Sequence, residues 1–211
     1  MDKTQILKAL EQLKDDKKKF VQSYDIIITL KDINTKTAPV DAVVVLPHSR
    51  GRVTKICAVV GQELAEQAAQ HCDRVIRETE LPKYRDNKAA KKLAGEYDFF
   101  VAQVTLMPQI AQVLGRSFGP RGKMPNPKAG CVVPPTGNMA VVKERLQKTV
   151  HMKSRDSLAL QCIIGSEQMK VEEVADNILA VVTQVSKVLP AEDQNVRAVY
   201  VKKTMSKPIK V

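Results

Sequence analysis

The chain has 211 residues, 44% of them hydrophobic, and 34 Lys and Arg against 23 Asp and Glu give it a formal net charge of +11. This length allows one or two domains with a sizeable core, and the hydrophobic content excludes a disordered chain. The basic balance favours a polyanionic partner, namely RNA, DNA or an anionic membrane surface. Neither a membrane-spanning apolar run nor an apolar leader is present, so we expect a soluble cytosolic protein without a membrane partner.

Composition also limits the kinds of site that the chain can form. Four cysteines lie far apart without a C-x-x-C pair, and three histidines form no ligand-spaced cluster. We therefore expect buried free thiols and no metal or cofactor. Aromatic residues make up only 4% of the chain, which argues against a platform that stacks several single-stranded bases. A nucleic-acid partner would be recognised through the shape of its folded backbone.

The sequence pattern of residues 1–52 predicts a helix followed by two strands. Apolar residues at helical spacing predict an amphipathic helix over residues 3–19 that ends in a basic run. Phe20 follows at once, and core packing is the ordinary role of a Phe at such a place. Short β-branched runs predict strands over residues 25–30 and 41–46, which could pair as a hairpin. Turn residues over 47–52 then indicate a domain boundary.

The middle of the chain alternates between strands and helices. Strands are predicted over residues 56–60, 74–76, 97–104 and 131–133, and helices over 62–71, 87–93, 107–114 and 138–148. This alternation is typical of an α/β unit around a largely parallel sheet.

The last sixty residues return to a sparser pattern of strand, helix and strand, over 158–164, 174–189 and 196–203. Neither terminal piece is large enough to stand alone. We therefore expect residues 1–52 and 152–211 to form one discontinuous α+β domain, with an α/β domain of residues 53–151 inserted into it. Two linkers, near Arg52 and near Met152, would make a hinge.

Residues 114–130 form the most unusual stretch, with four glycines, three prolines, four cations and no acid. Glycine and proline at this density predict a long shaped loop rather than a regular helix or strand. It is either a functional loop or a structural connection with solvated cations. It is not a P-loop, because Met124 follows Gly122 and Lys123 where Ser or Thr is needed, and Pro120 removes an amide.

No catalytic constellation is found, so a nucleotide-binding enzyme is the weaker alternative. A general DNA-binding protein is disfavoured because no groove-reading motif is present. Phosphate contacts from lysines and arginines fit the sequence best, with hydroxyls of Ser23, Thr37, Thr204 and Ser206 suited to ribose or phosphate oxygens. The tail over residues 201–211 has four lysines and no acid, and it is either such a contact or a frayed, solvated terminus.

The stretch 114–130 closely resembles the signature of the ribosomal protein L1 family. Leu-Pro-His at residues 46–48, Ala-Asp-Asn-Ile at 175–178 and Val-Tyr-Val-Lys-Lys-Thr-Met at 199–205 follow in the order and spacing of the family. The short N-terminus and Leu-Lys-Asp-Ile at 30–33 are more similar to archaeal than to bacterial members. The resemblance implies a discontinuous α+β domain with an inserted Rossmann-like α/β domain.

The resemblance also implies a function and a set of site residues. It implies binding to the stalk region of large-subunit ribosomal RNA, a part in release of deacylated tRNA from the exit site, repression of the protein's own mRNA, and residence on the cytoplasmic ribosome. The free protein would be a monomer without a cofactor and not an enzyme. The residues implied to contact RNA are Lys19, Phe20, Ser23, Lys31, Lys36, Thr37, Lys153, Arg155, Thr204, Met205, Ser206 and Pro208.

Two positions depart from the pattern of the family. Ser206 stands where many relatives have Gly, and Ala198 stands where many bacterial relatives have Ser. The conspicuous stretch itself is ranked as a secondary RNA contact or a structural clasp. Its basic residues are Arg116, Arg121, Lys123 and Lys128.

Overall fold

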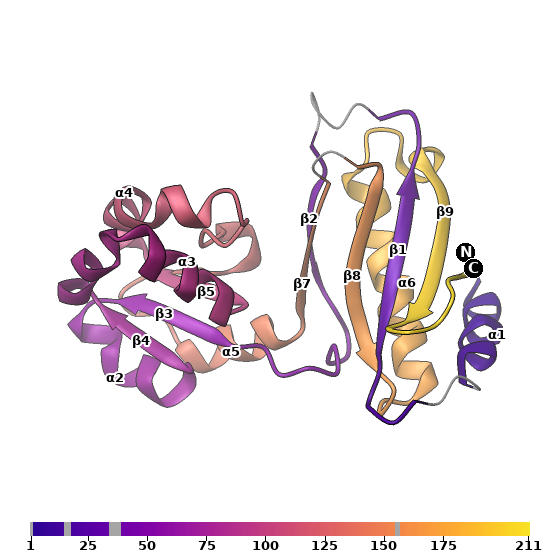
Figure 1. Cartoon of the computed structure of the whole chain (residues 1–211), viewed down its shortest axis with the longest axis horizontal. Coiled ribbons are helices and arrows are strands. Elements are labelled where there is room, and N and C mark those ends of the chain that lie inside the picture. The colour runs from indigo at the N-terminus through magenta and orange to yellow at the C-terminus, as the bar shows by residue number, and fades with distance from the viewer. Residues whose placement is uncertain (1, 15–17, 34–38, 155–156) are drawn as a thin grey trace. The chain divides into compact units, whose positions relative to one another are not determined.

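A computed structural model describes residues 2–14, 18–33, 39–154 and 157–211. The chain divides into two compact units, unit 1 (Met1–Arg52 and Lys148–Val211) and unit 2 (Val53–Gln147), shown in Figure 1. The predicted second boundary near Met152 differs from the observed one. Met152 lies within β7 (Thr149–Lys153), which pairs with β2 (Asp41–Val45), so the chain re-enters unit 1 before this strand. None of the described helices is long and apolar enough to cross a bilayer.

Unit 1 is built on an antiparallel sheet in the order β10-β9-β1-β8, with β2 and β7 forming a second, two-stranded sheet. The four strands are β1 (Ser23–Leu30), β8 (Ala159–Ser166), β9 (Val196–Lys203) and β10 (Ile209–Lys210). The predicted hairpin between the first two strands of the chain is wrong, because β1 pairs with β8 and β9 while β2 pairs with β7. Both terminal pieces therefore contribute strands to each sheet, which is why neither could fold alone.

The described part of unit 1 also contains the α-helices α1 (Lys3–Lys14) and α6 (Val171–Val188). Figure 1 shows α6 lying behind the four-stranded sheet. Alternate residues of β1 are buried and join one core with the inner faces of both helices. Fully burying a Val or Ile side chain contributes roughly 1.5–3 kcal/mol, so this shared core holds the discontinuous unit together. A short 3-10 helix, η4 (Glu192–Asn195), precedes β9.

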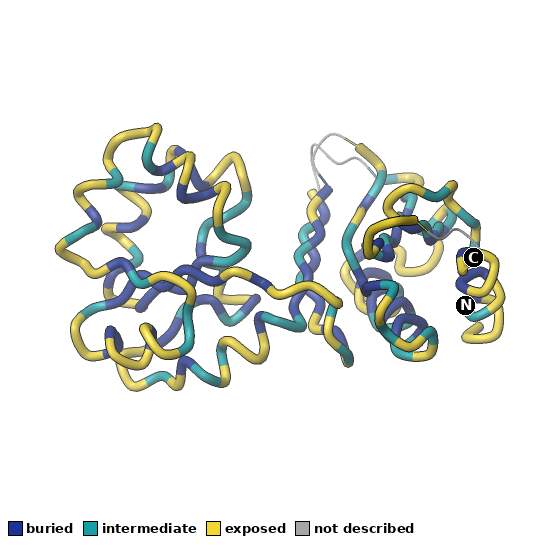
Figure 2. Tube along the Cα trace, turned by 60° about the horizontal axis from the view of Figure 1, so that its bottom comes forward, coloured by how far each residue is buried: buried dark blue, intermediate teal, exposed yellow. Residues whose placement is uncertain are grey.

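Unit 2 has a parallel sheet in the order β4-β3-β5-β6, with helices on both faces. Its strands are β3 (Ile56–Val60), β4 (Arg74–Arg77), β5 (Phe99–Gln103) and β6 (Val132–Val133). Its helices are α2 (Gln62–His71), α3 (Asn87–Glu96), α4 (Met107–Phe118) and α5 (Met139–Gln147), with 3-10 segments η1 (Glu78–Arg85), η2 (Val104–Leu106) and η3 (Pro127–Ala129). Counted along the chain, this strand order begins as the flavodoxin-type doubly wound sheet does, with the reversal between β3 and β5. Figure 2 shows the central strands of unit 2 mostly buried.

The helix α4 extends further than the sequence predicts. It continues to Phe118, so the first five residues of the expected loop 114–130 are helical and the prediction is wrong there. Phe118 is fully buried, and its ring lies 4.4 Å, between centroids, from that of Phe100. Packing of Leu114 and Phe118 against the core therefore overrides the low helix propensity of Gly115.

Candidate nucleic-acid interface

The predicted site residues fall at the two ends of β1. Lys19, Phe20 and Ser23 lie at its start, whereas Lys31 follows its last residue, about 25 Å away at roughly 3.3 Å per residue. The turn of residues 204–206 lies beside the start of β1, and Lys153 ends β7. Lys36, Thr37 and Arg155 were also predicted, and they lie outside the described residues.

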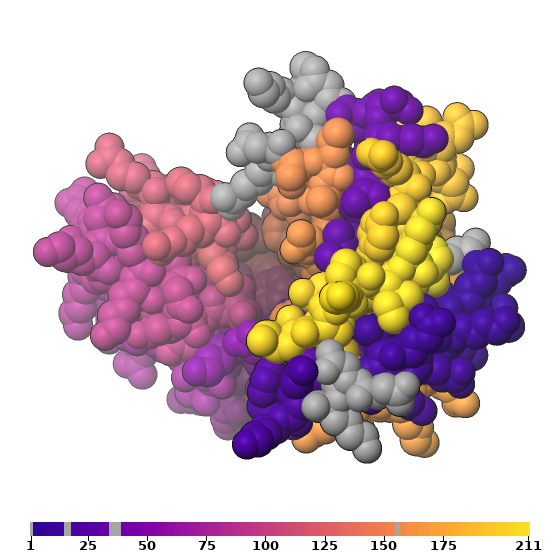
Figure 3. All heavy atoms as spheres, turned by 45° about the vertical axis from the view of Figure 1, so that its right-hand side comes forward, coloured from indigo at the N-terminus to yellow at the C-terminus, as the bar shows by residue number. Residues whose placement is uncertain are grey.

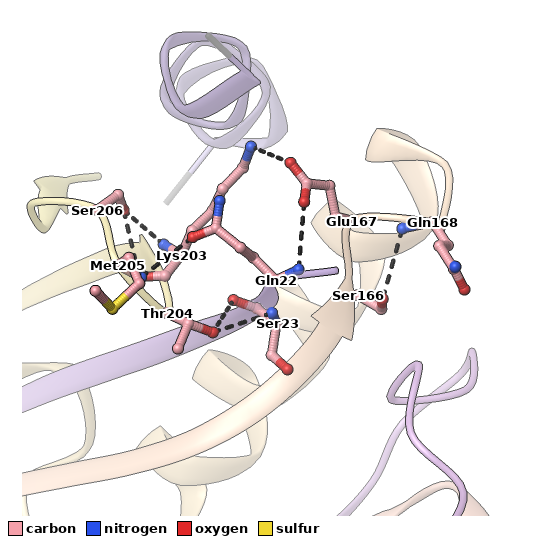
Figure 4. Close-up of polar contacts among 9 residues, drawn as sticks. All are labelled: Gln22, Ser23, Ser166, Glu167, Gln168, Lys203, Thr204, Met205 and Ser206. Atoms are coloured by element: carbon pink, nitrogen blue, oxygen red, sulfur yellow. Dashed lines mark hydrogen bonds and ion pairs between the residues drawn. The ribbon is translucent and has the colours of Figure 1, made fainter. Parts of the chain in front are cut away.

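Hydrogen bonds donated by backbone N–H groups join the start of β1 to the turn after β9, as Figure 4 shows. The N–H of Ser23 donates to Thr204 Oγ1 at 3.1 Å, and the N–H of Thr204 donates to the carbonyl of Ser23 at 3.1 Å. The N–H of Met205 donates to Gln22 Oε1 at 3.2 Å. Segments about 180 residues apart in sequence thus form one continuous surface. We call residues 18–23 and 204–208 the strand-end surface.

A buried ion pair lies beneath the strand-end surface. Lys203 Nζ lies 2.7 Å from Glu167 Oε1, and the Lys203 side chain is only 1% exposed. The other oxygen of Glu167 accepts from the N–H of Gln22 at 3.3 Å, and the N–H of Glu167 donates to the Gln22 carbonyl at 2.9 Å. Burial, and secondarily the Glu167 carboxylate, raises the pKa of the adjacent Tyr24. This network fixes the end of β9 against β8 and the chain entering β1.

Sequence reasoning missed Gln22, Glu167 and Lys203. Only Lys203 carried a signal: it occupies the next inward position after Val199 and Val201, which are both buried. A lysine at a core-facing position requires a partner, because an unpaired buried charge is too costly. That partner, Glu167, is 36 residues away, and pairing it with Lys203 required the sheet register.

Ser206 closes the turn after β9. Its Oγ accepts the N–H of Lys203 at 2.7 Å, and its own N–H donates to the Lys203 carbonyl at 3.2 Å. Among the described non-glycine residues, positive φ occurs only at Asp32 and Glu192, so Ser206 needs no glycine-like backbone. The serine is therefore accommodated at this position without backbone strain.

Large apolar side chains protrude from the strand-end surface. Phe20 is 52% exposed, Val21 55% and Met205 65%. The core-packing role expected for Phe20 is therefore wrong. Lys18, Lys19 and Lys207 are exposed in the same segments, and Figure 3 shows the two ends of the chain side by side on one face. Apolar side chains flanked by cations suit a partner with both stacked rings and phosphates.

The C-terminal tail is ordered. Ile209 and Lys210 pair with β9 as β10, and the N–H of Val211 donates to the Val199 carbonyl at 3.0 Å. The frayed terminus considered from the sequence is therefore wrong for this segment. Pro208 lies between the turn and β10 and is exposed.

At the opposite end of β1, Lys31 is held through its backbone. Its N–H donates to the carbonyl of Asn195 at 2.9 Å, and Asn195 Nδ2 donates to the Lys31 carbonyl at 3.2 Å. The side chains of Lys31 and Lys153 are exposed. These two lysines can contact a ligand that extends along unit 1, but they are not part of the strand-end surface.

The basic residues of the stretch 114–130 have different roles. Lys123 Nζ donates to the carbonyls of Tyr97 and Asp98 at 3.0 and 2.9 Å, and Arg121 Nη1 donates to the Lys91 carbonyl at 2.7 Å. These bonds fix the loop to the residues before β5 and to α3, so two of its cations act as a structural clasp. Arg116, in the last turn of α4, and Lys128, in η3, remain exposed.

A cavity of about 440 Å³ lies at the carboxyl ends of β3 and β5, where doubly wound sheets bind nucleotides. Glu63 and Glu78 line it, and carboxylates repel phosphate. The N–H of Gly61 is already bonded to Gln103 Oε1 at 2.8 Å. The cavity therefore gives the nucleotide-binding alternative no support. In the described part of the chain, no three His, Cys, Asp or Glu side chains gather as metal ligands.

The four cysteines are free thiols, as predicted. The predicted burial is confirmed for Cys57 and Cys131 but is wrong for Cys72 and Cys162, which are only partly buried. Burial raises the pKa of Cys57 to about 12 and that of Cys131 to about 11, despite nearby cations that lower it. These raised pKa values keep the Cys57 and Cys131 thiols protonated at neutral pH.

The fold is that of a mixed α/β protein. Its exposed cations and apolar side chains gather at the end of a sheet, which is typical of a binding surface and not of an enclosed reaction centre. The comparisons with known proteins then assign the family. The model described as "Ribosomal protein L1p/L10e family" matches residues 7–207, and the chain belongs to the ribosomal protein L1 family. Members of this family are ribosomal proteins rather than enzymes.

Similar relatives come from archaea, which confirms the archaeal type expected from the sequence. The protein of Methanothermococcus thermolithotrophicus is 39% identical over 100% of this chain and 99% of its own length. Those of Methanocaldococcus jannaschii and Pyrococcus horikoshii are each 38% identical over 100% of this chain and 96% of their own length. All three are named large ribosomal subunit protein uL1.

Proposed function

We propose that this protein is a component of the large ribosomal subunit in the cytoplasm and binds the stalk region of the large-subunit ribosomal RNA through unit 1. The observation that carries the proposal is the exposure of Phe20 and Met205 beside cations in a chain that matches the L1 family over its full length. The apolar side chains would pack on bases or riboses, and Lys18, Lys19 and Lys207 would contact phosphates. Lys31 and Lys153 would extend the contact along unit 1.

The hydrogen-bond network supports this proposal because it holds the contact residues in place before RNA arrives. Thr204 and Met205 are bound through their N–H groups to Ser23 and Gln22, so ordering them costs little on binding. A preorganised surface suits recognition of a folded RNA shape.

We also propose that the same surface binds the protein's own mRNA and represses its translation, and that the ribosome-bound protein assists release of deacylated tRNA from the exit site. The two RNAs would compete for one surface. An unlabelled transcript of the operon that contains the gene should displace the labelled rRNA stalk fragment. Simultaneous binding of both RNAs would refute the shared surface.

The central test is a salt titration of binding to the rRNA stalk fragment, to unrelated duplex RNA and to DNA. The stalk fragment should bind most tightly, and the logarithm of the affinity should fall linearly with the logarithm of salt concentration, by about 0.7–0.9 per phosphate contact. Equal affinity for the three polymers would leave only general phosphate binding.

Met205→Asp should weaken binding to the stalk fragment by more than about 2 kcal/mol, because it replaces an apolar contact with a charge that RNA repels. Val141→Asp is the matched control, since Val141 is 61% exposed and lies on α5 of unit 2. Circular dichroism establishes that both variants are folded. Unchanged affinity of folded Met205→Asp would remove the turn from the site.

A further inference from the structure

The charge of unit 2 is concentrated on one of its two helical layers. The helices α3 and α4 cover one face of the sheet, and α2 and α5 cover the other. With the loop that runs on to Gly130, the α3–α4 layer carries seven Lys and Arg against one acid, Glu96. The helices α2 and α5 carry two Lys and Arg against three acids. The positive charge of unit 2 is therefore concentrated on the side of the sheet covered by α3 and α4.

The helix α3 presents its lysines on a single exposed side. It buries Ala90, Leu93 and Ala94 against the core. Lys88, Lys91 and Lys92 lie at i, i+3 and i+4 on the opposite side, and all three are exposed. Residues at this spacing have Cβ atoms about 5–6 Å apart, close enough for like charges to destabilise a helix slightly.

Two contacts bring further cations to this helix. Arg121 Nη1 donates to the Lys91 carbonyl at 2.7 Å, and Ser117 Oγ donates to Asn87 Oδ1 at 3.3 Å. The end of α4 and the following loop are thereby fixed beside α3. We call Lys88, Lys91, Lys92, Arg116 and Arg121 the basic face.

The cations of the basic face are not neutralised within the protein. Within the described ranges of the chain, Lys88, Lys91, Lys92 and Arg116 form no ion pair and no side-chain hydrogen bond. The bond of Arg121 goes to an uncharged carbonyl, so its charge is not compensated either. Clustered like charges weaken the fold slightly, and a bound polyanion would relieve this repulsion.

We propose that the basic face of unit 2 binds the backbone phosphates of a second RNA duplex, separate from the RNA held by unit 1. Lysines on flexible stems contact phosphates without regard to base sequence. A membrane surface fits less well, because interfacial helices insert large apolar side chains. The large exposed apolar residues described in unit 2 are Val53, Val104 and Val141, all outside α3 and α4. An acidic protein partner would likewise need an apolar interface centre.

The test uses the full-length protein with one molar equivalent of the rRNA stalk fragment, so that unit 1 is occupied while little free stalk RNA remains to compete for unit 2. A labelled RNA duplex of unrelated sequence then reports binding to unit 2 by fluorescence anisotropy. Replacement of Lys88, Lys91 and Lys92 by Gln should weaken duplex binding at least 10-fold and reduce the salt slope by about 2. The matched control replaces Lys55, Arg77 and Lys143 by Gln, which removes the same charge from unit 2 outside the basic face, and should weaken binding less than 3-fold.

Three results would overturn the proposal: no duplex binding by the stalk complex, equal weakening by the two triple variants, or a tighter, equally lysine-dependent interaction with poly-glutamate or anionic vesicles. Met205→Asp separates this proposal from the function proposed for unit 1. It should lose the stalk fragment but keep the duplex. Parallel loss of both RNAs in this variant would mean that a single surface binds them.

Discussion

The buried ion pair between Lys203 and Glu167 should control the stability of unit 1 asymmetrically. The Lys203 side chain is 1% exposed and that of Glu167 is 26% exposed. Removing the carboxylate therefore leaves a charge in the core, whereas removing the ammonium leaves a carboxylate that water reaches. Removing one partner of a buried ion pair, so that the other charge stays in the core, costs about 3–5 kcal/mol.

We expect Glu167→Ala to lower the free energy of unfolding by about 3 kcal/mol, the lower end of that range, because Glu167 is partly hydrated. Lys203→Met keeps most of the side-chain volume and leaves Glu167 its bond from the N–H of Gln22. It should cost only about 1 kcal/mol. The double variant should resemble Lys203→Met, so the coupling energy between the two positions should have a magnitude of about 3 kcal/mol.

Urea denaturation of the two single variants and the double variant measures these values. Lys3→Met provides the control, because its pair with Asp176 is 46% and 37% exposed and should contribute less than about 1 kcal/mol. Equal destabilisation by Glu167→Ala and Lys203→Met would refute the reasoning, since it would mean that the two charges are equally shielded from water.

Two further predictions concern unit 2. Lys123→Met should destabilise it by about 2 kcal/mol, because the carbonyls of Tyr97 and Asp98 lose a charged donor; thermal unfolding measures this, and an unchanged midpoint would contradict the clasp. The pKa of Cys57 is raised from 9.0 to about 12 in the folded state, so the unfolded chain loses its thiol proton first and stability should fall as pH rises above 9. Cys57→Ala should make that fall shallower by about 1 kcal/mol per pH unit between pH 9 and 11. Identical slopes for the two proteins would show that the buried thiol does not contribute.

Most elements could be predicted because their periodicity is local. Residues 56–60 and 62–71 were expected as strand and helix, and β3 and α2 have these bounds. The failures arise from tertiary pairing. The hairpin was expected from nearness in sequence, but β2 finds its partner in β7, more than 100 residues later. The helix α4 continues past Gly115 because Phe118 is buried, and neither fact is visible in a window of a few residues.

The candidate site was predicted as a list of contact residues but not as an arrangement. Exposure separates Phe20 and Met205 from core residues, and it depends on where the surrounding chain runs. The supporting network of Gln22, Glu167 and Lys203 joins three distant segments, so its partners could be paired only through the sheet register. Polar networks of this kind leave little periodic signal because each member is a single residue.

The stretch 114–130 and the strand-end surface show why unusual composition and function need not coincide. In the stretch, glycine and proline allow the chain to turn back, so that Lys123 reaches the two carbonyls before β5. Some of its cations therefore hold the loop in place and are not available to contact RNA. In the strand-end surface, the residue types are common, but large apolar side chains are exposed to solvent. The hydrogen bond between the N–H of Met205 and Gln22 Oε1 helps to hold them there. Exposed apolar side chains are unfavourable in water, and packing them against a partner removes this cost. The strand-end surface is therefore a stronger candidate for the RNA contact than the stretch 114–130.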